Sequence, residues 1–285
     1  MTNKKGSLYI VATPIGNMGD MTERAQQVLA SVDVIAVEDT RRSGQLLRNF
    51  DISTPMIAVH EHNERQICES LLKRINAGES IALISDAGTP LLSDPGYYLV
   101  TQSREQNIPV IPVPGVSAVI TALSVAGLPT DRFVFEGFLP AKSAARQQRL
   151  EKLKEDTRTL VFYEAPHRIV DMLKDLQLVF GPQRKVVLAR ELTKTFETVH
   201  GDKLEQLIPW VESDENQRKG EFVVLVHGAE ARDSSDIDPE SERILLILLD
   251  ELPVKQAAAL ASRLTGLKKN MLYQHALELK RDGTE

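Results

Sequence analysis

The sequence predicts an α/β protein made of two α/β domains and a small helical extension. Over residues 7–127, short apolar segments rich in β-forming residues alternate with helical segments, which is typical of a mostly parallel sheet with crossover helices. Residues 131–228 continue with strands and helices in an order that favours a mixed sheet. An acidic, Ser-rich stretch then precedes a purely helical pattern. We therefore expect domains at 1–130 and 131–228, a linker at 229–240 and an extension at 241–285.

Composition restricts the class of protein further. The 285 residues are 42% hydrophobic, enough for a sizeable core, and no apolar run approaches the roughly 20 residues of a membrane span. The formal net charge of -6 excludes a global basic field, so contact with nucleic acid requires local basic patches. Cys68 is the single cysteine, and residues 1–5 do not resemble a secretory signal. These features predict a cytoplasmic protein without membrane contact.

Apolar β-rich runs and helical periodicity give the order of elements in the first domain. The expected strands are 7–12, 32–37, 55–59, 80–84 and 108–113, and the expected helices are 21–30, 40–47, 66–77, 96–105 and 119–126. Prolines in the last strand favour the edge of the sheet or a sharp exit from it, because proline cannot donate a ladder hydrogen bond. Asp39 or Thr40 and, further on, Asn63 stand where side chains cap helices.

The second domain and the extension follow a connection at 127–131. The expected strands are 133–136, 158–163, 185–189, 196–200 and 221–227, with a helix at 143–155 and the helices of the extension at 240–252, 255–264 and 268–280. Pro253 and Gly266 separate the last three helices. A basic helix after a short Gly turn resembles a helix-turn-helix, and a packing hairpin used for dimerisation fits the same pattern.

The stretch 84–96 is the one around which the chain is organised. It follows a buried strand and contains Gly88 and Gly96, which permit unusual backbone angles or close approach of a ligand. Asp94 stands where it can cap a helix that starts at Pro95. A carboxylate and exposed backbone at the carboxyl end of a strand suit a ligand crevice, whereas an ordinary turn with a helix cap explains the same residues.

Polar residues follow several other expected strands. Residues 38–42 hold two acids and two arginines, which either cap the next helix or bind substrate and phosphate. His60 and His62 suggest a metal, but no third ligand has a recognisable spacing, so a loop and helix start are the better interpretation. Residues 114–118 open a helix whose free N–H groups suit a carboxylate ligand, unless the small residues serve packing alone.

Six segments together resemble one known family. They are 8–17 (LYIVATPIGN), 38–41 (EDTR), 84–96 (ISDAGTPLLSDPG), 114–118 (PGVSA), 136–140 (EGFLP) and 189–194 (ARELTK). In this order they resemble the ribosomal RNA small-subunit methyltransferase I family of the tetrapyrrole methylase superfamily, over about residues 8–228 and with a matching tail. The resemblance implies class III methyltransferase domains that bind S-adenosylmethionine in the cleft between them.

The resemblance also implies an activity and its residues. The expected reaction is methylation of a cytidine 2′-hydroxyl in 16S ribosomal RNA by a homodimer without a metal. The acidic net charge separately suggests the hypothesis that the assembled small subunit is the substrate, because its shape can supply contacts that naked RNA lacks. The residues expected to bind S-adenosylmethionine are Pro14, Asp86, Gly88, Thr89, Ser117, Ala118, Tyr163 and Ala189. A ribose hydroxyl needs a carboxylate to take its proton. The expected catalytic residues are Glu38, Asp39, Arg41 and Glu164, and Glu191 is a further carboxylate at a strand exit. Glu38 or Asp39 is the first choice of base. Arg41 and Arg42 are expected to bind RNA phosphate.

Two other classes of function fit parts of the pattern. A methyltransferase for a tetrapyrrole or another small molecule has the same fold but less need of the basic tail, so deletion of residues 240–285 separates it from an RNA enzyme. A non-catalytic RNA-binding or assembly module predicts that substitutions at Asp86 leave its function intact.

Overall fold

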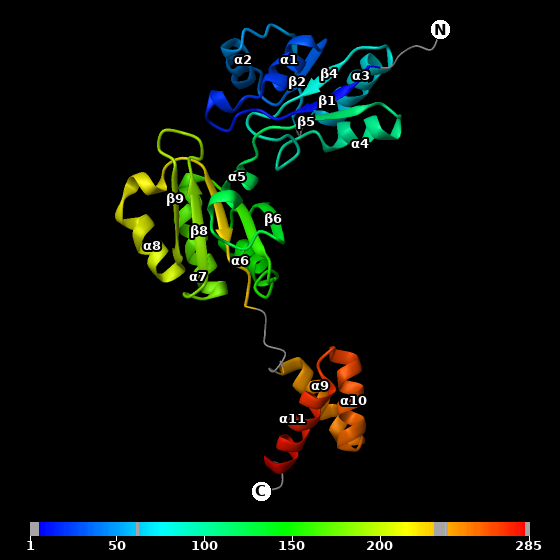
Figure 1. Cartoon of the computed structure of the whole chain (residues 1–285), viewed down its shortest axis with the longest axis vertical. Helices are drawn as coiled ribbons and strands as arrows, with labels where there is room; N and C mark the ends of the chain where they lie inside the picture. Colours follow the sequence, from blue (N-terminus) through cyan, green and yellow to red (C-terminus); the bar gives the residue numbers. More distant parts are fainter. Residues whose placement is uncertain (1–5, 61–62, 231–236, 238, 283–285) are drawn as a thin grey trace. The chain divides into compact units, whose positions relative to one another are not determined.

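The computed structural model describes residues 6–60, 63–230, 237 and 239–282. The chain forms two compact units, residues 1–229 and 230–285. The first unit contains two five-stranded sheets, and the described part of the second consists of helices (Figure 1). The predicted division at residue 130 therefore falls inside one compact unit, between its two sheets, and the domain limits stay predictions.

The first sheet is entirely parallel, as predicted. Its strands have the order β3-β2-β4-β1-β5, with Leu8 paired to Ile81 on one side and to Val110 on the other. The strands are β1 (Leu8–Val11), β2 (Val34–Val37), β3 (Met56–Ala58), β4 (Ile81–Leu83) and β5 (Val110–Val113). The Pro-containing β5 lies at an edge, which confirms the prediction. Both faces of the sheet are covered, so its central strands are continuous apolar runs.

Helices cover this sheet on both sides (Figure 1). Side chains of α1 (Glu23–Ser31) and α2 (Thr40–Asn49) form one hydrophobic cluster with it, and those of α3 (Glu64–Asn76) and α4 (Tyr97–Glu105) form another. This layering directs the carboxyl ends of the parallel strands, and the loops after them, to one edge of the sheet.

The second sheet is mixed, also as predicted. Its order is β6-β7-β10-β8-β9, and the β6–β7 pair is parallel while the other pairs are antiparallel. The strands are β6 (Phe133–Phe138), β7 (Thr159–Glu164), β8 (Lys185–Arg190), β9 (Thr198–Lys203) and β10 (Phe222–Val226). The strand expected at 196–200 begins two residues later than predicted, because Phe196 belongs to the connection before β9.

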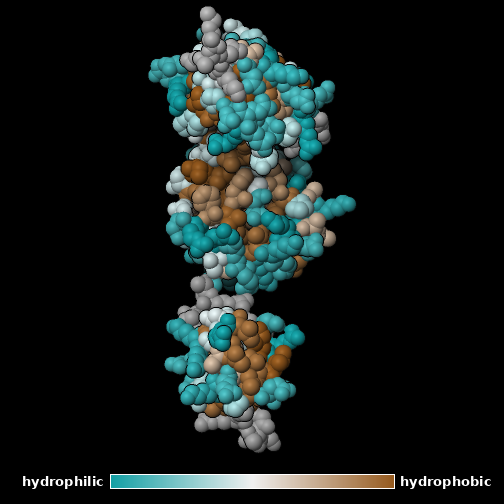
Figure 2. Space-filling model, turned by 90° about the vertical axis from the view of Figure 1, so that its right-hand side faces the viewer, coloured by the Kyte–Doolittle hydropathy of each residue, from teal (hydrophilic) through white to brown (hydrophobic). Residues whose placement is uncertain are grey.

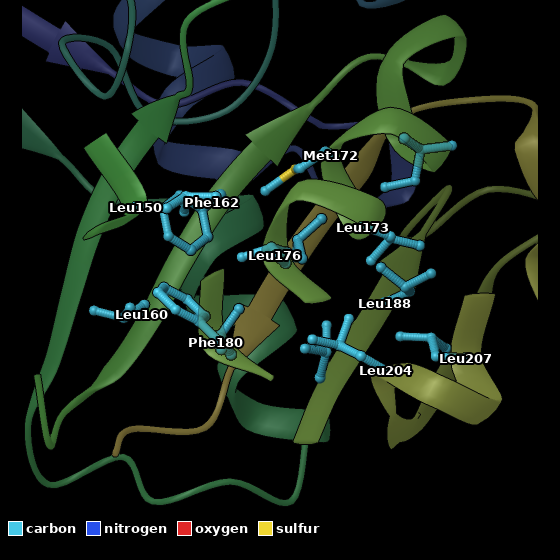
Figure 3. Close-up of a cluster of buried hydrophobic side chains, with 14 of the residues drawn as sticks. Leu150, Leu160, Phe162, Met172, Leu173, Leu176, Phe180, Leu188, Leu204 and Leu207 are labelled. Carbon is cyan, nitrogen blue, oxygen red and sulfur yellow. The ribbon is translucent and has the colours of Figure 1, made fainter. Parts of the chain in front are cut away.

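Different helices cover the two faces of the second sheet. On one face, α6 (Ser143–Glu151), α7 (Ile169–Phe180) and α8 (Leu204–Ser213) enclose a core in which Phe162, Leu173 and Leu188 pack together (Figure 3). On the other face lies α5 (Ala118–Val125), whose Val119, Ala122 and Leu123 contact the sheet. The helix α6 ends earlier than the predicted residue 155. The helix α5 connects the two sheets in sequence and starts at the edge where the first sheet's loops gather.

Of the three predicted helix N-caps, one is confirmed by a side-chain hydrogen bond and two are not. Asp39 is the N-cap of α2 and its side chain accepts a hydrogen bond from the Arg41 N–H, as predicted. Asn63 stands at the N-cap of α3 without capping it, because its side chain bonds to backbone groups of Ala58 and His60 instead. The cap predicted at Asp94 is wrong: α4 begins after Gly96 without a side-chain cap.

The second unit holds three described helices close to the predicted ranges. They are α9 (Pro239–Glu251), α10 (Val254–Thr265) and α11 (Lys269–Asp282). Leu245, Ala258 and Leu272 are fully buried in its core. Gly266, in the left-handed region with φ of 77°, ends α10. No helix in the described parts of the chain is long and apolar enough to cross a membrane.

Candidate active site

A cavity of about 360 Å³ lies between the loops of the first sheet and one end of the second sheet. This volume is in the range of pockets that bind small molecules. The wall contains twenty residues. From the first half of the chain come Ile15, Ala87, Gly88, Thr89, Leu92, Ser93, Asp94, Ser117 and Ala118. From the second half come Phe138, Tyr163, Glu164, Ala165, Pro166, Ala189, Leu192, Lys194, Glu221, Phe222 and Val223.

Loops after three strands of the first sheet are joined at the cavity. Thr13, after β1, and Gly88, after β4, exchange both backbone hydrogen bonds, at 2.9 and 3.0 Å. The Thr89 hydroxyl donates to the Val116 carbonyl, after β5, at 2.9 Å. Gly88 has a φ of 80°, and a Cβ there would lie 3.3 Å from the side chain of Ile15. The glycine therefore permits both the turn and the close approach of the first loop.

The start of α5 offers unused polar groups to the cavity. Ser117 is the N-cap residue, yet its hydroxyl makes no capping hydrogen bond. Its Oγ is buried and has no hydrogen-bond partner among the described residues. A buried hydroxyl without a partner costs free energy unless a ligand or water completes it. The first N–H groups of a helix also point out of its end, although here that of Val119 already hydrogen-bonds to the Tyr163 hydroxyl. This corner of the cavity therefore suits a polar group such as a carboxylate.

Aromatic rings form the wall contributed by the second sheet. Tyr163 on β7 packs edge-on against Phe135, with ring centroids 5.0 Å apart, and against Phe138 at 5.6 Å. Burial raises the pKa of Tyr163 to about 12, with the charge of Asp94 adding to the effect. The phenol is therefore a hydrogen-bond donor at neutral pH. Phe138 is 56% exposed, which is unusual for so large an apolar side chain.

Glu164, the last residue of β7, is a buried carboxylate in the wall. Its Oε1 accepts from the Ala165 N–H at 2.8 Å and lies 3.1 Å from Arg168 Nε. Its Oε2 is buried and has no hydrogen-bond partner among the described residues. Burial raises its pKa, although the Ala165 N–H and the nearby cations act in the opposite direction. One carboxylate oxygen is thus held in place, and the other is enclosed without a partner, because the Glu164 side chain is fully buried.

An ion pair holds the loop after β8 against the start of β10. Lys194 Nζ lies 2.8 Å from carboxylate oxygens of both Glu191 and Glu221. Glu191 and Thr193 have φ of 50° and 67°, which is uncommon for residues other than glycine. The aliphatic part of Lys194 would contact a Cβ at Gly16, so this loop also reaches the loop after β1. The lysine and Glu221 both line the cavity.

The structure brings together most of the sequence-predicted residues. Those that line the cavity are Gly88, Thr89, Ser117, Ala118, Tyr163, Glu164 and Ala189. Those absent from the lining are Pro14, Glu38, Asp39, Arg41 and Asp86. Asp86 accepts a hydrogen bond from the Asp39 N–H at 3.2 Å and pairs with Arg42 at 3.0 Å. The roles given to these residues stay predictions.

The local environment makes Asp39 and Arg41 less suited to chemistry than Glu164. The Arg41 N–H and guanidinium hold the pKa of the Asp39 carboxyl below its usual range, so it is a weak base. The side chain of Arg41 is 92% exposed. No cluster of three or more His, Cys, Asp or Glu in the described ranges is arranged to hold a metal ion. His62 lies outside the described residues, so the metal site considered for His60 and His62 stays outside what the structure describes.

Asp94, Phe138 and Lys194 were missed as cavity residues in the sequence. Asp94 belongs to the central motif, where the Asp-Pro pair favours a helix cap. Ser93, with a φ of 69°, instead turns the chain, and the carboxylate faces the cavity. Phe138 and Lys194 lie in segments 136–140 and 189–194 that carried the family resemblance. That membership was the one signal available for them.

The fold is that of tetrapyrrole methylases. The family model described as Tetrapyrrole (Corrin/Porphyrin) Methylases matches residues 7–208. A crystal structure of diphthine synthase has a TM-score of 0.61 at 14% identity, covering 78% of this chain and 90% of that one. A uroporphyrin-III C-methyltransferase from Thermus thermophilus, complexed with S-adenosylhomocysteine, gives 0.53 at 21% identity, covering 77% and 97%. At these identities, the structures establish the fold alone.

Sequence relatives define the family more closely. Proteins named ribosomal RNA small subunit methyltransferase I are 54% identical in Escherichia coli O157:H7, over 97% of this chain and 96% of that protein, and 57% identical in Vibrio cholerae serotype O1, over 95% and 94%. A model described as the RsmI C-terminal HTH domain matches residues 235–280. The chain belongs to the ribosomal RNA small subunit methyltransferase I family.

Proposed function

We propose that this protein transfers a methyl group from S-adenosylmethionine to the 2′-hydroxyl of a cytidine in small-subunit (16S) ribosomal RNA. The observation that carries the proposal is identity above half with relatives of this name over nearly the whole of both chains. The cavity supports it independently, because it combines an apolar aromatic wall with polar groups that lack partners.

The cavity residues fit S-adenosylmethionine. Ser117 Oγ and the first N–H groups of α5 suit its amino acid carboxylate, and the narrow space at Gly88 suits a flat adenine or ribose edge. Tyr163 offers a phenolic donor, and Ala189 leaves room beside it. When bound, the sulfonium supplies an electrophilic methyl carbon. The protein must then hold the ribose oxygen in line with that carbon and exclude water.

The proton of the 2′-hydroxyl also needs an acceptor, since a neutral hydroxyl is a poor nucleophile. Glu164 lines the cavity and has one unpartnered oxygen, but its side chain is fully buried and would have to turn to reach a substrate. Glu38 and Asp39 remain candidates from the sequence. Arg41 and Arg42, both exposed, suit contact with RNA phosphate near the cavity.

Local features support RNA as the substrate despite the acidic net charge. Phe138 offers an exposed ring at the cavity, and single-stranded bases stack on such rings. The second unit carries exposed cations at Lys255, Arg263, Lys268 and Lys269. These patches are small, so we propose that the assembled subunit, rather than naked RNA, supplies the remaining contacts.

An apolar surface on the first unit supports a homodimer. Ile120 and Val125 on α5 are 57% and 52% exposed, and Phe133 on β6 is exposed as well. Figure 2 shows hydrophobic surface gathered over the middle of this unit. Large exposed apolar patches mark interaction sites in soluble proteins. We further propose a cytoplasmic location. The single cysteine is free and buried, which fits a reducing compartment, and the proposed substrate, the ribosomal subunit, is found there.

The experiment is transfer of labelled methyl from S-adenosylmethionine to unmethylated small ribosomal subunits, followed by alkaline hydrolysis of the RNA. A 2′-O-methyl group removes the internal nucleophile of strand cleavage, so label in an alkali-resistant dinucleotide containing cytidine is the expected result. Label in ordinary mononucleotides would move the target to a base. Absence of label would favour a tetrapyrrole or another small-molecule substrate, or a module without catalysis. Binding of S-adenosylhomocysteine separates these two.

A further inference from the structure

The carboxylates in the cavity wall differ in whether a partner already holds them. Glu221 pairs with Lys194 at 2.8 Å, and Glu164 is held by the Ala165 N–H and by Arg168. The groups that act on Asp94 are the Ser85 hydroxyl and the carboxylates of Glu38 and Asp86, and no cation is among them. Among the described residues, Asp94 is therefore the wall carboxylate for which no ion pair with a cation is found.

The backbone fixes the Asp94 side chain at the cavity. Ser93 and Gly96 have φ of 69° and 123°, so the chain turns sharply on both sides of Asp94. The Ser93 side chain lies against Gly137 of β6, where a Cβ would be 3.0 Å from its Oγ. This close approach joins the loop to the second sheet.

The surroundings of Asp94 make it a moderately strong base. Burial raises its pKa, a hydrogen bond with the Ser85 side chain lowers it, and the charges of Glu38 and Asp86 raise it, giving a pKa of about 6. A carboxyl with this pKa is mostly ionised at neutral pH, yet holds a proton more firmly than an ordinary aspartate. Asp39 is the opposite case, because its hydrogen bonds stabilise the charged form.

We propose that Asp94 is the catalytic base of the methyl transfer, the group that accepts the proton of the ribose 2′-hydroxyl. The inference rests on the proposed function and names the base that the sequence left open. As the 2′-oxygen forms its bond to the methyl carbon, the carbon–sulfur bond breaks and its electron pair stays on sulfur. The 2′-proton passes to an Asp94 carboxylate oxygen and then to water, which leaves S-adenosylhomocysteine and the methylated ribose.

The other ionisable side chains around the cavity are held in different ways from Asp94. Tyr163, whose phenol stays protonated, faces Asp94 from β7 and its pKa is raised by the Asp94 charge. Glu164, Lys194 and Glu221 complete the charged wall. The Glu164 side chain is fully buried, and Lys194 is shared between the carboxylates of Glu191 and Glu221.

The test compares Asp94→Asn with wild type on small subunits across pH. Asparagine keeps the shape and removes the proton acceptor, so kcat should fall by about 10²–10⁴-fold. The dissociation constant for S-adenosylhomocysteine, measured by calorimetry, should change less than about threefold, which also shows that the variant is folded. In wild type, kcat should fall below about pH 6 as Asp94 takes up a proton. In the variant, the residual rate should lose that acid limb.

Ser85→Ala is a matched probe of the same carboxylate. It removes a hydrogen bond that favours the ionised form, so the pKa of Asp94 rises and the acid limb moves to higher pH. Glu38→Gln removes a like charge, so the same limb moves to lower pH. A direct role of Glu38 as base would instead abolish the limb.

Each outcome of these experiments either supports or overturns the assignment of Asp94 as the base. Wild-type-like kcat in Asp94→Asn overturns the assignment, as does loss of the acid limb in Glu38→Gln or Glu164→Gln while Asp94→Asn retains it. In those cases the alkali-resistant label made by wild type still supports the proposed function. Wild-type protein that makes no alkali-resistant label overturns both.

Discussion

Arg42 Nη1 lies 3.0 Å from Asp86 Oδ2, so the central motif is joined to the first turn of α2. Oδ1 of the same carboxylate accepts the Asp39 N–H. Asp86 thus fixes the loop after β2 to the loop after β4. Both loops are parts of the family resemblance, and the pair connects residues predicted to bind the cofactor with residues predicted to bind RNA.

Asp86→Asn tests whether this carboxylate also contacts S-adenosylmethionine. A direct charged hydrogen bond is worth about 1.5–3 kcal/mol, so its loss should raise the dissociation constant for S-adenosylhomocysteine at least about tenfold. The free energy of unfolding should change by less than about 1 kcal/mol, because Arg42 is 75% exposed. Arg42→Gln breaks the same pair and should leave affinity unchanged. Equal weakening by both variants would mean that Asp86 acts only through the loop.

Ser117→Ala removes a buried hydroxyl that has no partner among the described residues. Stability of the ligand-free protein should stay the same or increase by about 1 kcal/mol, since an unsatisfied polar group is lost. Calorimetry should show about tenfold weaker binding of S-adenosylhomocysteine. The control is Ser124→Ala on the exposed side of the same helix, which should alter neither quantity. Unchanged affinity in Ser117→Ala would remove this hydroxyl from the binding site.

Phe138→Ala tests stacking of the target base. Loss of a base–aromatic contact costs about 1–3 kcal/mol, so KM for small subunits should rise about tenfold or more. Phe196→Ala is the matched control, because that ring is also exposed but does not line the cavity. Equal effects of both variants would point to a general apolar surface rather than to a base contact.

Asp175→Ala tests a buried network outside the cavity. Asp175 accepts from Arg146 Nε at 2.6 Å and from Gln147 at 2.7 Å, and Arg146 is 3% exposed. Removing the carboxylate leaves a buried charge, so urea unfolding should show a loss of about 3–5 kcal/mol. Lys174→Ala, which breaks an ion pair with Glu212 in which both side chains are exposed, should cost less than about 1 kcal/mol.

The same carboxylate gives a pH dependence of stability. Burial disfavours its charged form, but hydrogen bonds from Gln147, Arg146 and Ser143 outweigh burial and lower the pKa of Asp175. A lowered pKa in the folded state means that the stabilisation is complete above the unfolded value of about 4 and is lost as pH falls below it. The difference between wild type and Asp175→Ala should therefore shrink below about pH 4. A difference that stays constant to pH 2 would contradict the assignment.

The sheets could be predicted from sequence because each strand is an apolar, β-rich run between turn residues. Strand β9 was displaced because it alternates exposed and half-buried residues and begins beside the exposed Phe196. Asp94 was misassigned for another reason: Asp-Pro favours a helix start locally, whereas Ser93 adopts a positive φ and its side chain lies against Gly137 of β6. The conformation of that loop depends on tertiary contacts, which local propensity does not predict.

Site residues followed the same division. Gly88, Thr89 and Ser117 could be placed because they follow predicted strands whose carboxyl ends meet at one edge. Phe138 and Lys194 reach the cavity only because the second sheet packs against that edge. Local sequence patterns do not predict how the two sheets pack. Asp39 shows the converse, since its cap role was correctly predicted and reduces its basicity.

The cavity is walled by loops of one sheet and by strand ends of the other, so neither sheet can bind the ligand alone. A molecule that binds only this assembled wall is thermodynamically linked to both sheets at once. At a hundredfold excess over its dissociation constant it should stabilise the whole first unit by about 2.7 kcal/mol. Melting in its presence should shift as one cooperative transition, with the two sheets losing structure together.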